Sequence, residues 1–208
     1  MKSHRFLLSI AVVMLVSAVA FAQNQADTQK ESAAKSDGHK PDMHKSAEAA
    51  PSLAQKSFNQ LKTLTGTWEG PVSLDPPQPD MDNGKPLHVS MRVTSRGNAL
   101  VHEMQEAGTP LDPTKYDHPV TMFYVDSERL TLIHYCDAGN RPRMTGKVSA
   151  DGKTVEFDFL DLAGSTQYGH MHHAVFTAID ANHHTEDWTY MEPGDKPVHA
   201  HLDLQRTK

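Results

Sequence analysis

Apolar and polar residues alternate along much of the chain beyond residue 66. In residues 87–93 every second residue is apolar, with histidine, serine and arginine between. Such period-two alternation is typical of strands that bury one face. We expect strands in residues 67–73, 87–93, 99–105, 120–125, 129–136, 143–149, 155–159, 170–179, 185–191 and 198–206.

Turn-forming residues separate several of these segments. Arg96-Gly97-Asn98, Asp126-Ser127 and Asp151-Gly152 each suit a hairpin connection. Roughly ten short strands at such spacing are typical of a barrel or a sandwich. We therefore predict an all-β fold, a single up-and-down antiparallel β-barrel of roughly ten strands.

One short helix is predicted before the first strand. Ser52 is a suitable N-cap, and the helix should end near Gly66. The apolar residues that recur near helical spacing, and so form one face, are Ala54, Phe58, Leu61 and Leu64.

The chain before this helix predicts an exported protein. Residues 1–22 resemble a signal peptide, with the positive Lys2 and Arg5, an apolar run and a small-residue cleavage site at Ala20-Phe21-Ala22. The apolar run is too short to favour a membrane anchor. We expect a periplasmic or secreted protein that has no membrane partner after signal cleavage.

Composition divides the remaining chain into two parts. Residues 23–51 are polar, contain no aromatic residue and predict a disordered linker. Residues 52–208 then form the barrel domain. The chain has 26 acidic and 20 basic residues, and loss of Lys2 and Arg5 with the signal peptide would leave a net charge of −8. This charge argues against nucleic-acid partners.

Few residues point to a reaction. The sequence lacks Gly-x-Ser-x-Gly, His-Glu-x-x-His, a phosphate-binding glycine loop and Cys-x-x-Cys. An enzyme acting on a small substrate in the barrel is our third hypothesis. The single cysteine, Cys136, cannot form an internal disulfide. It is either a small core residue or a soft metal ligand or redox-sensitive thiol.

The order of a helix, Gly66-x-Trp68 and an antiparallel series of strands resembles the calycin superfamily, which includes lipocalins and fatty-acid-binding proteins. In lipocalins an arginine near the end of the last strand commonly lies across this tryptophan, and Arg206 stands at that place. The resemblance implies a Trp68–Arg206 stack at the barrel base, and an interior that can hold a ligand.

Two further resemblances bear on function. Residues 134–144 are similar to a recurring block in uncharacterised exported bacterial proteins of lipocalin-like type. Gly66, Trp68 and Gly70 also resemble the start of nitrobindin-like haem barrels. That resemblance implies a haem-ligating histidine near the C-terminus, a place taken here by His199 or His201.

Histidines are concentrated near the C-terminus. Two neighbours at i and i+2 in a strand point to the same side, roughly 6.5–7 Å apart, and can share one metal ion with a third ligand. His170 with His172 and His199 with His201 have this spacing. Zinc or copper would suit such imidazoles. Alternatively, His199 and His201 lie on the solvent face of the last strand.

Our leading hypothesis is a small, largely apolar ligand in the barrel. His134 shares a strand face with apolar residues, so it is either a hydrogen-bonded core histidine or a ligand contact. Arg141 and Arg143 flank a proline in a predicted loop, where they either clamp an anionic group or pair with nearby acids. Trp188 completes the predicted ligand-binding set. The alternative is a barrel that binds a metal or haem through the C-terminal histidines.

Overall fold

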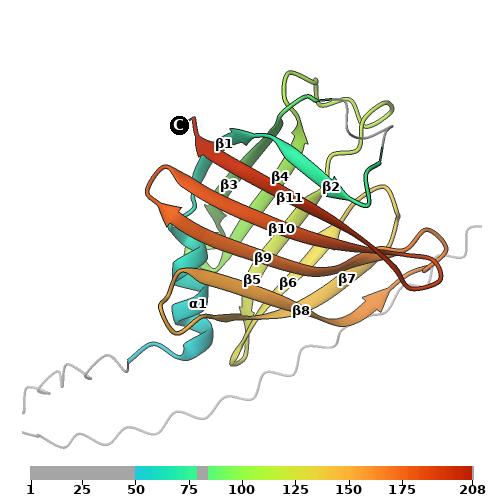
Figure 1. Ribbon diagram of the computed structural model, residues 1–208. Coiled ribbons are helices and arrows are strands. Elements are labelled where there is room, and N and C mark those ends of the chain that lie inside the picture. The colour runs from blue at the N-terminus through green and yellow to red at the C-terminus, as the bar shows by residue number, and fades with distance from the viewer. Residues whose placement is uncertain (1–49, 79–83, 208) are drawn as a thin grey trace, which may run out of the picture. The chain divides into compact units, whose positions relative to one another are not determined.

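The computed structural model describes residues 50–78 and 84–207. The predicted signal peptide and all but the last two residues of the predicted linker lie outside these ranges. Within the described ranges, ten strands close into an antiparallel barrel, and α1 is the one α-helix (Figure 1). The predicted all-β barrel with a short preceding helix is confirmed.

The elements follow one another around the barrel. α1 (Leu53–Lys62) leads into β1 (Gly66–Gly70) and β2 (Val72–Asp75). The later strands are β3 (Leu87–Thr94), β4 (Ala99–Glu106), β5 (Val120–Asp126), β6 (Arg129–Tyr135), β7 (Arg141–Val148), β8 (Thr154–Ala163), β9 (His170–Asp180), β10 (His183–Glu192) and β11 (Lys196–Arg206). From β3 on, each strand pairs with the next, and β11 returns to pair with β1 and β2.

β1 and β2 are two parts of one barrel strand, interrupted at Pro71. Proline has no N–H to donate to the ladder, which explains the break. β1 bridges β3 and β11, whereas β2 continues along β11 alone. A Cβ atom on Gly70 would lie 1.7 Å from the carbonyl oxygen of Asp203, so the barrel closes here only because residue 70 is glycine.

α1 covers one end of the barrel. The Ser52 hydroxyl accepts a hydrogen bond from the backbone N–H of Gln55 at 3.2 Å and caps the helix. The side chains of Phe58 and Leu61 are buried in the core. Because the backbone N–H of Val148 donates to the Ser57 hydroxyl at 3.1 Å, the helix is also attached to the end of β7.

Trp68 and Arg206 meet at the base of the barrel, opposite one another in the β1–β11 pair. The guanidinium carbon of Arg206 lies 3.9 Å from the centroid of the fully buried Trp68 ring. The indole N–H of Trp68 donates to the Leu64 carbonyl at 2.8 Å, and Arg206 donates to the carbonyls of Ala181 and Thr65. This is the stacked pair that the calycin resemblance implied.

The connection between β6 and β7 is shorter than we predicted. β7 already begins at Arg141, so the predicted loop placement of Arg141 was wrong, whereas Arg143 lies in a strand, as the predicted strand 143–149 had it. Pro142 and Met144, which alternate with the two arginines, are buried, as the period-two geometry of a strand requires. Cys136 is half-buried after β6, and burial raises the pKa of its thiol. No helix in the described ranges is long and apolar enough to cross a membrane.

Candidate functional site

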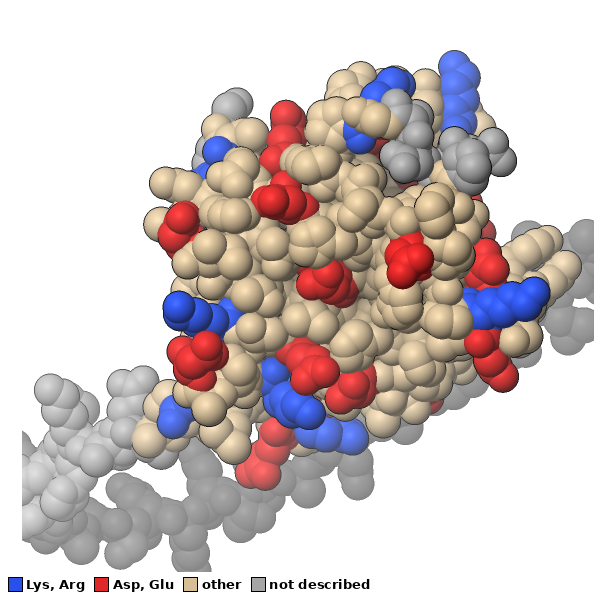
Figure 2. All heavy atoms as spheres, in the orientation of Figure 1, with Lys and Arg blue, Asp and Glu red and all other residues tan. Residues whose placement is uncertain are grey.

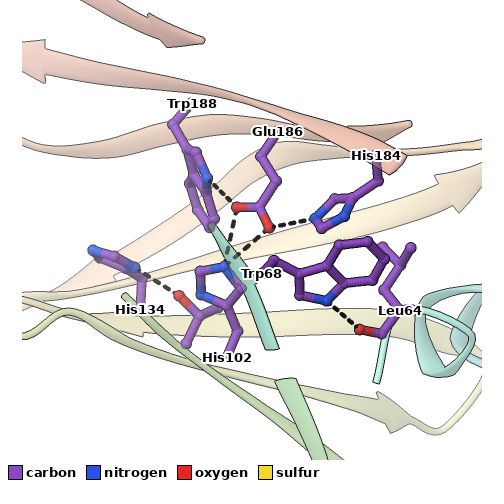
Figure 3. Close-up of polar contacts among 8 residues, drawn as sticks. Leu64, Trp68, His102, His134, His184, Glu186 and Trp188 are labelled. Carbon is purple, nitrogen blue, oxygen red and sulfur yellow. Dashed lines mark hydrogen bonds and ion pairs between the residues drawn. The ribbon is translucent and has the colours of Figure 1, made fainter. Parts of the chain in front are cut away.

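A layer of polar side chains crosses the interior of the barrel (Figure 3). Strand alternation places these residues on the same inner faces as the apolar core, so each is buried. The layer consists of His102 on β4, Thr121 on β5, His134 on β6, and His184, Glu186 and Trp188 on β10.

Glu186 is the centre of this polar layer. Its carboxylate lies 3.0 Å from Nε2 of His102 and 3.0 Å from Nε2 of His184, and it accepts the indole N–H of Trp188 at 2.9 Å. Burial by itself would raise the pKa of this carboxyl. The attraction of His102 and the hydrogen bonds from both histidines outweigh burial and hold the pKa below its usual range. The barrel therefore encloses an ionised carboxylate.

His134 lies beside Glu186 and its partners but has different surroundings. Its Nδ1 is 2.8 Å from the Thr121 hydroxyl, and its ring centroid is 5.7 Å from that of Trp188. Burial, with a smaller contribution from His102, lowers its pKa to about 3. The ring is therefore neutral at physiological pH. Its Nε2 is buried and has no hydrogen-bond partner in the described ranges.

The barrel end opposite α1 is lined by partly buried apolar side chains. Val72, Leu87, Met104, Met171 and Ala200 pack against the buried core from this side while each retains some exposure. The loops that join β4 to β5, β6 to β7 and β8 to β9 also lie at this end, because α1 packs at the opposite turns of the antiparallel meander (Figure 1). Met104 on β4 lies two residues beyond His102 toward this end, whereas Ala200 lies opposite Trp188 in the β10–β11 pair.

The structure divides the predicted ligand-binding residues into two groups. His134 and Trp188 lie together inside the barrel. Arg141 and Arg143 lie on the outer face of β7, where Arg143 forms a bidentate pair with Asp161 that includes an Nε–Oδ1 contact of 2.7 Å. The outward orientation follows from the buried inner positions of Pro142 and Met144. Arg143 therefore takes the second predicted role, pairing with a nearby acid.

The four predicted metal ligands do not form one cluster. His170 and His172 are partly buried, and Nε2 of His170 lies 3.2 Å from Nδ1 of His172. His199 and His201 are exposed on the outer face of β11, where they border a hollow of about 320 Å³. On the face formed by β8–β11, acidic side chains are scattered among residues of other kinds, and lysine and arginine lie mostly toward its edges (Figure 2).

Sequence reasoning missed His102, His184 and Glu186. One signal was present: in the predicted strand 185–191, Glu186 alternates with Trp188 and therefore belongs to the same face. A carboxylate on a buried face requires partners, which indicates a polar site. His184 has the same parity as Glu186 and Trp188 but lies one residue before the predicted strand, and the sequence offered no indication of the partner from β4.

Comparison with known proteins defines the architecture and no more. No protein-family profile and no curated protein matches the sequence. The fold is similar to the crystal structure of Rv2717c from M. tuberculosis, with a TM-score of 0.51 and 14% identity over 73% of this chain and 98% of that chain.

A weaker similarity is to a DUF3598-family protein of unknown function from Nostoc punctiforme. Its TM-score is 0.36 and the identity is 10%, over 71% of this chain and 48% of that chain. The class that fold and site define is a closed ten-stranded antiparallel barrel with a buried histidine–glutamate layer.

Proposed function

We propose that this protein binds a small, largely apolar molecule at the barrel end opposite α1, with a polar group of the ligand on Nε2 of His134. The observation that carries the proposal is the unpartnered Nε2 of this neutral, buried ring. Buried polar atoms in proteins are nearly always hydrogen-bonded. Nδ1 of His102 and of His184 also lack a partner in the described ranges, but the rings of these two residues are held by Glu186. His134, in contrast, is hydrogen-bonded only to a hydroxyl. The free nitrogen of His134 therefore suggests a partner from outside the protein.

The surroundings of His134 support a ligand of this kind. Trp188 offers an aromatic wall beside the imidazole, and its own N–H is already used by Glu186. Partly buried apolar residues at this end of the barrel, among them Met104 and the Ala200 opposite Trp188, offer further apolar contacts. Apolar walls with a few fixed polar groups are the usual composition of small-molecule sites. Arg141 and Arg143 take no part in this proposal, since they lie outside.

The test combines native mass spectrometry with the affinity for a fluorescent apolar probe. We expect a co-purifying small molecule, or a probe that competes with added ligands and quenches Trp188. His134→Asn should weaken binding by about tenfold, since it removes the imidazole Nε2 that bonds the ligand. His199→Asn, on the outer face, is the matched control and should bind normally. Equal affinity in both variants, or a barrel that holds only water at His134, would contradict the proposal.

Haem is the second candidate ligand, and the same nitrogen favours it. A neutral imidazole whose Nδ1 is fixed by a hydrogen bond and whose Nε2 is free has the form of a metal-ligating histidine. His199 and His201, which the nitrobindin resemblance suggested, lie on the outer face. Haem reconstitution should give a Soret band that His134→Ala removes and His199→Ala retains. A wild-type protein without this band would exclude haem.

A further inference from the structure

We propose a second site, independent of the barrel ligand: His170 and His172 form a two-imidazole chelate for a divalent transition-metal ion, copper(II) or zinc(II). Nε2 of His170 lies 3.2 Å from Nδ1 of His172. Two nitrogens that each lie about 2.0–2.1 Å from one tetrahedral ion are themselves about 3.3–3.4 Å apart. The two rings therefore already have the separation that a shared ion requires.

A β-bulge produces this short separation. In the pairing of β9 with β10, Thr189 lies opposite His173 and Tyr190 lies opposite Met171, so His172 has no partner in the ladder. In a regular strand, side chains at i and i+2 are roughly 6.5–7 Å apart. A bulge re-aims the side chain of its extra residue, and here it turns His172 toward His170.

An aromatic ring holds both imidazoles in place. Phe159 stacks on His172 at a centroid distance of 4.9 Å and an interplanar angle of 18°, and it packs on His170 at 4.8 Å. This packing limits rotation of both rings and so lowers the entropic cost of binding an ion.

The pair His199 and His201 has the same sequence spacing and shows the contrast. This part of β11 is in regular register with β10. Each ring is directed to a different partner: His199 Nδ1 lies 3.1 Å from the Thr189 hydroxyl and His201 Nδ1 lies 2.6 Å from Asp187. Without a bulge, the two rings are not joined to each other, so this pair is a natural internal control.

A competing group lies on the outer face of β8 and β9. Ligand atoms of Glu156, Asp158 and His173 lie within 4.8 Å of one another. However, the Lys147 ammonium is 3.9 Å from both carboxylates. His173 already uses both ring nitrogens, at 3.3 Å from Asp158 and 3.7 Å from Glu156. The Lys147 ammonium already neutralises these carboxylates, and both nitrogens of His173 already face them, so this group is a weaker metal site.

The first test measures binding of copper(II) and zinc(II) to the full chain by isothermal titration calorimetry. Loss of outer-sphere contacts alone typically weakens metal sites 10–100-fold, so His170→Asn and His172→Asn should each weaken binding by at least about tenfold. The double variant His199→Asn/His201→Asn and the variant His173→Asn should leave affinity nearly unchanged. Wild-type affinity in the His170→Asn and His172→Asn variants, or absence of binding in the wild type, would overturn the proposal.

The second test needs no substitution at the site and so does not depend on variants that fold. Diethyl pyrocarbonate modifies accessible, neutral imidazoles, and mass spectrometry locates the modified residues. Zinc should protect His170 and His172 while His199 and His201 react as before. Zinc protection of His199 and His201, or no protection of His170 and His172, would overturn the assignment even if calorimetry detects binding.

Discussion

Glu186 remains charged in the interior because N–H groups from three side chains reach its carboxylate. His102 brings one of these donors from β4, across the barrel from β10. His184 also packs edge-on against Trp68 at 4.2 Å, and Arg206 covers another part of that indole. A continuous series of contacts thus runs from the base of the barrel to its polar layer. Removing one hydrogen-bond donor to such a buried charge lowers the free energy of unfolding, so the polar layer contributes to stability as well as to the proposed binding.

His134 predicts an acid-sensitive fold. Its pKa is about 3 in the folded barrel, against an ordinary value of 6.5, so the unfolded chain binds the proton more readily between these two values. The contribution of neutral His134 to the free energy of unfolding should be fully present above pH 6.5. It should be lost as the pH drops toward 3, by about 1.4 kcal/mol per pH unit for one proton. Urea unfolding at a series of pH values measures this slope.

The variant His134→Asn should make the slope shallower, because asparagine does not titrate. Measurements between about pH 7 and about pH 5 separate this effect from Glu186, whose lowered pKa costs stability only at lower pH, below the ordinary carboxyl range. His199→Asn is the control and should retain the wild-type slope. An unchanged slope in His134→Asn would show that other groups carry the acid sensitivity.

At the scale of elements, strand parity and its interruptions decide which side chains meet. Regular alternation on β11 places His199 and His201 outside, and on β6 it places His134 inside. The bulge in β9 interrupts the alternation and brings His170 and His172 together. Parity was predictable from the sequence at each of these strands, but the bulge depends on pairing with β10 and was not.

Closure of the barrel between β1 and β11 gives a prediction at this scale. Gly70→Ala would place a methyl group 1.7 Å from the Asp203 carbonyl oxygen, so the two strands must separate. We expect a loss of more than about 3 kcal/mol in the free energy of unfolding, comparable to other severe core overpacking. Thermal and urea unfolding provide the measurement.

Gly152→Ala is the matched control for this prediction. Gly152 has a φ of 73° in a hairpin turn, and a Cβ there would meet no atom within 4 Å. Only the backbone strain remains, which should cost about 1 kcal/mol. If both variants lose similar stability, close approach of β1 and β11 is not what requires glycine at residue 70.

At the scale of the whole molecule, the barrel domain has a core of its own, capped by α1. A chain that begins at residue 50 should therefore unfold at the same urea concentration as the full chain. A chain that begins at residue 66 should lose at least about 3 kcal/mol, because Phe58, Leu61 and Leu64 no longer cover the barrel end. Equal midpoints for all three chains would contradict a structural role for α1.

The sequence by itself determined the class of fold. Period-two alternation and turn residues were enough to predict roughly ten strands, and the Ser52 N-cap with apolar residues at helical spacing predicted the preceding helix, because these signals are local or repeat along the chain. The pair of Trp68 with Arg206 was implied by the calycin resemblance instead. The tertiary structure alone decided which polar residues became neighbours. His102 and Glu186 are 84 residues apart, and their contact exists because the closed barrel places β4 and β10 across one interior. Nor could the sequence show that Nε2 of His134 has no partner among the described residues, because a hydrogen bond across the barrel depends on distance in space and not on spacing in the chain.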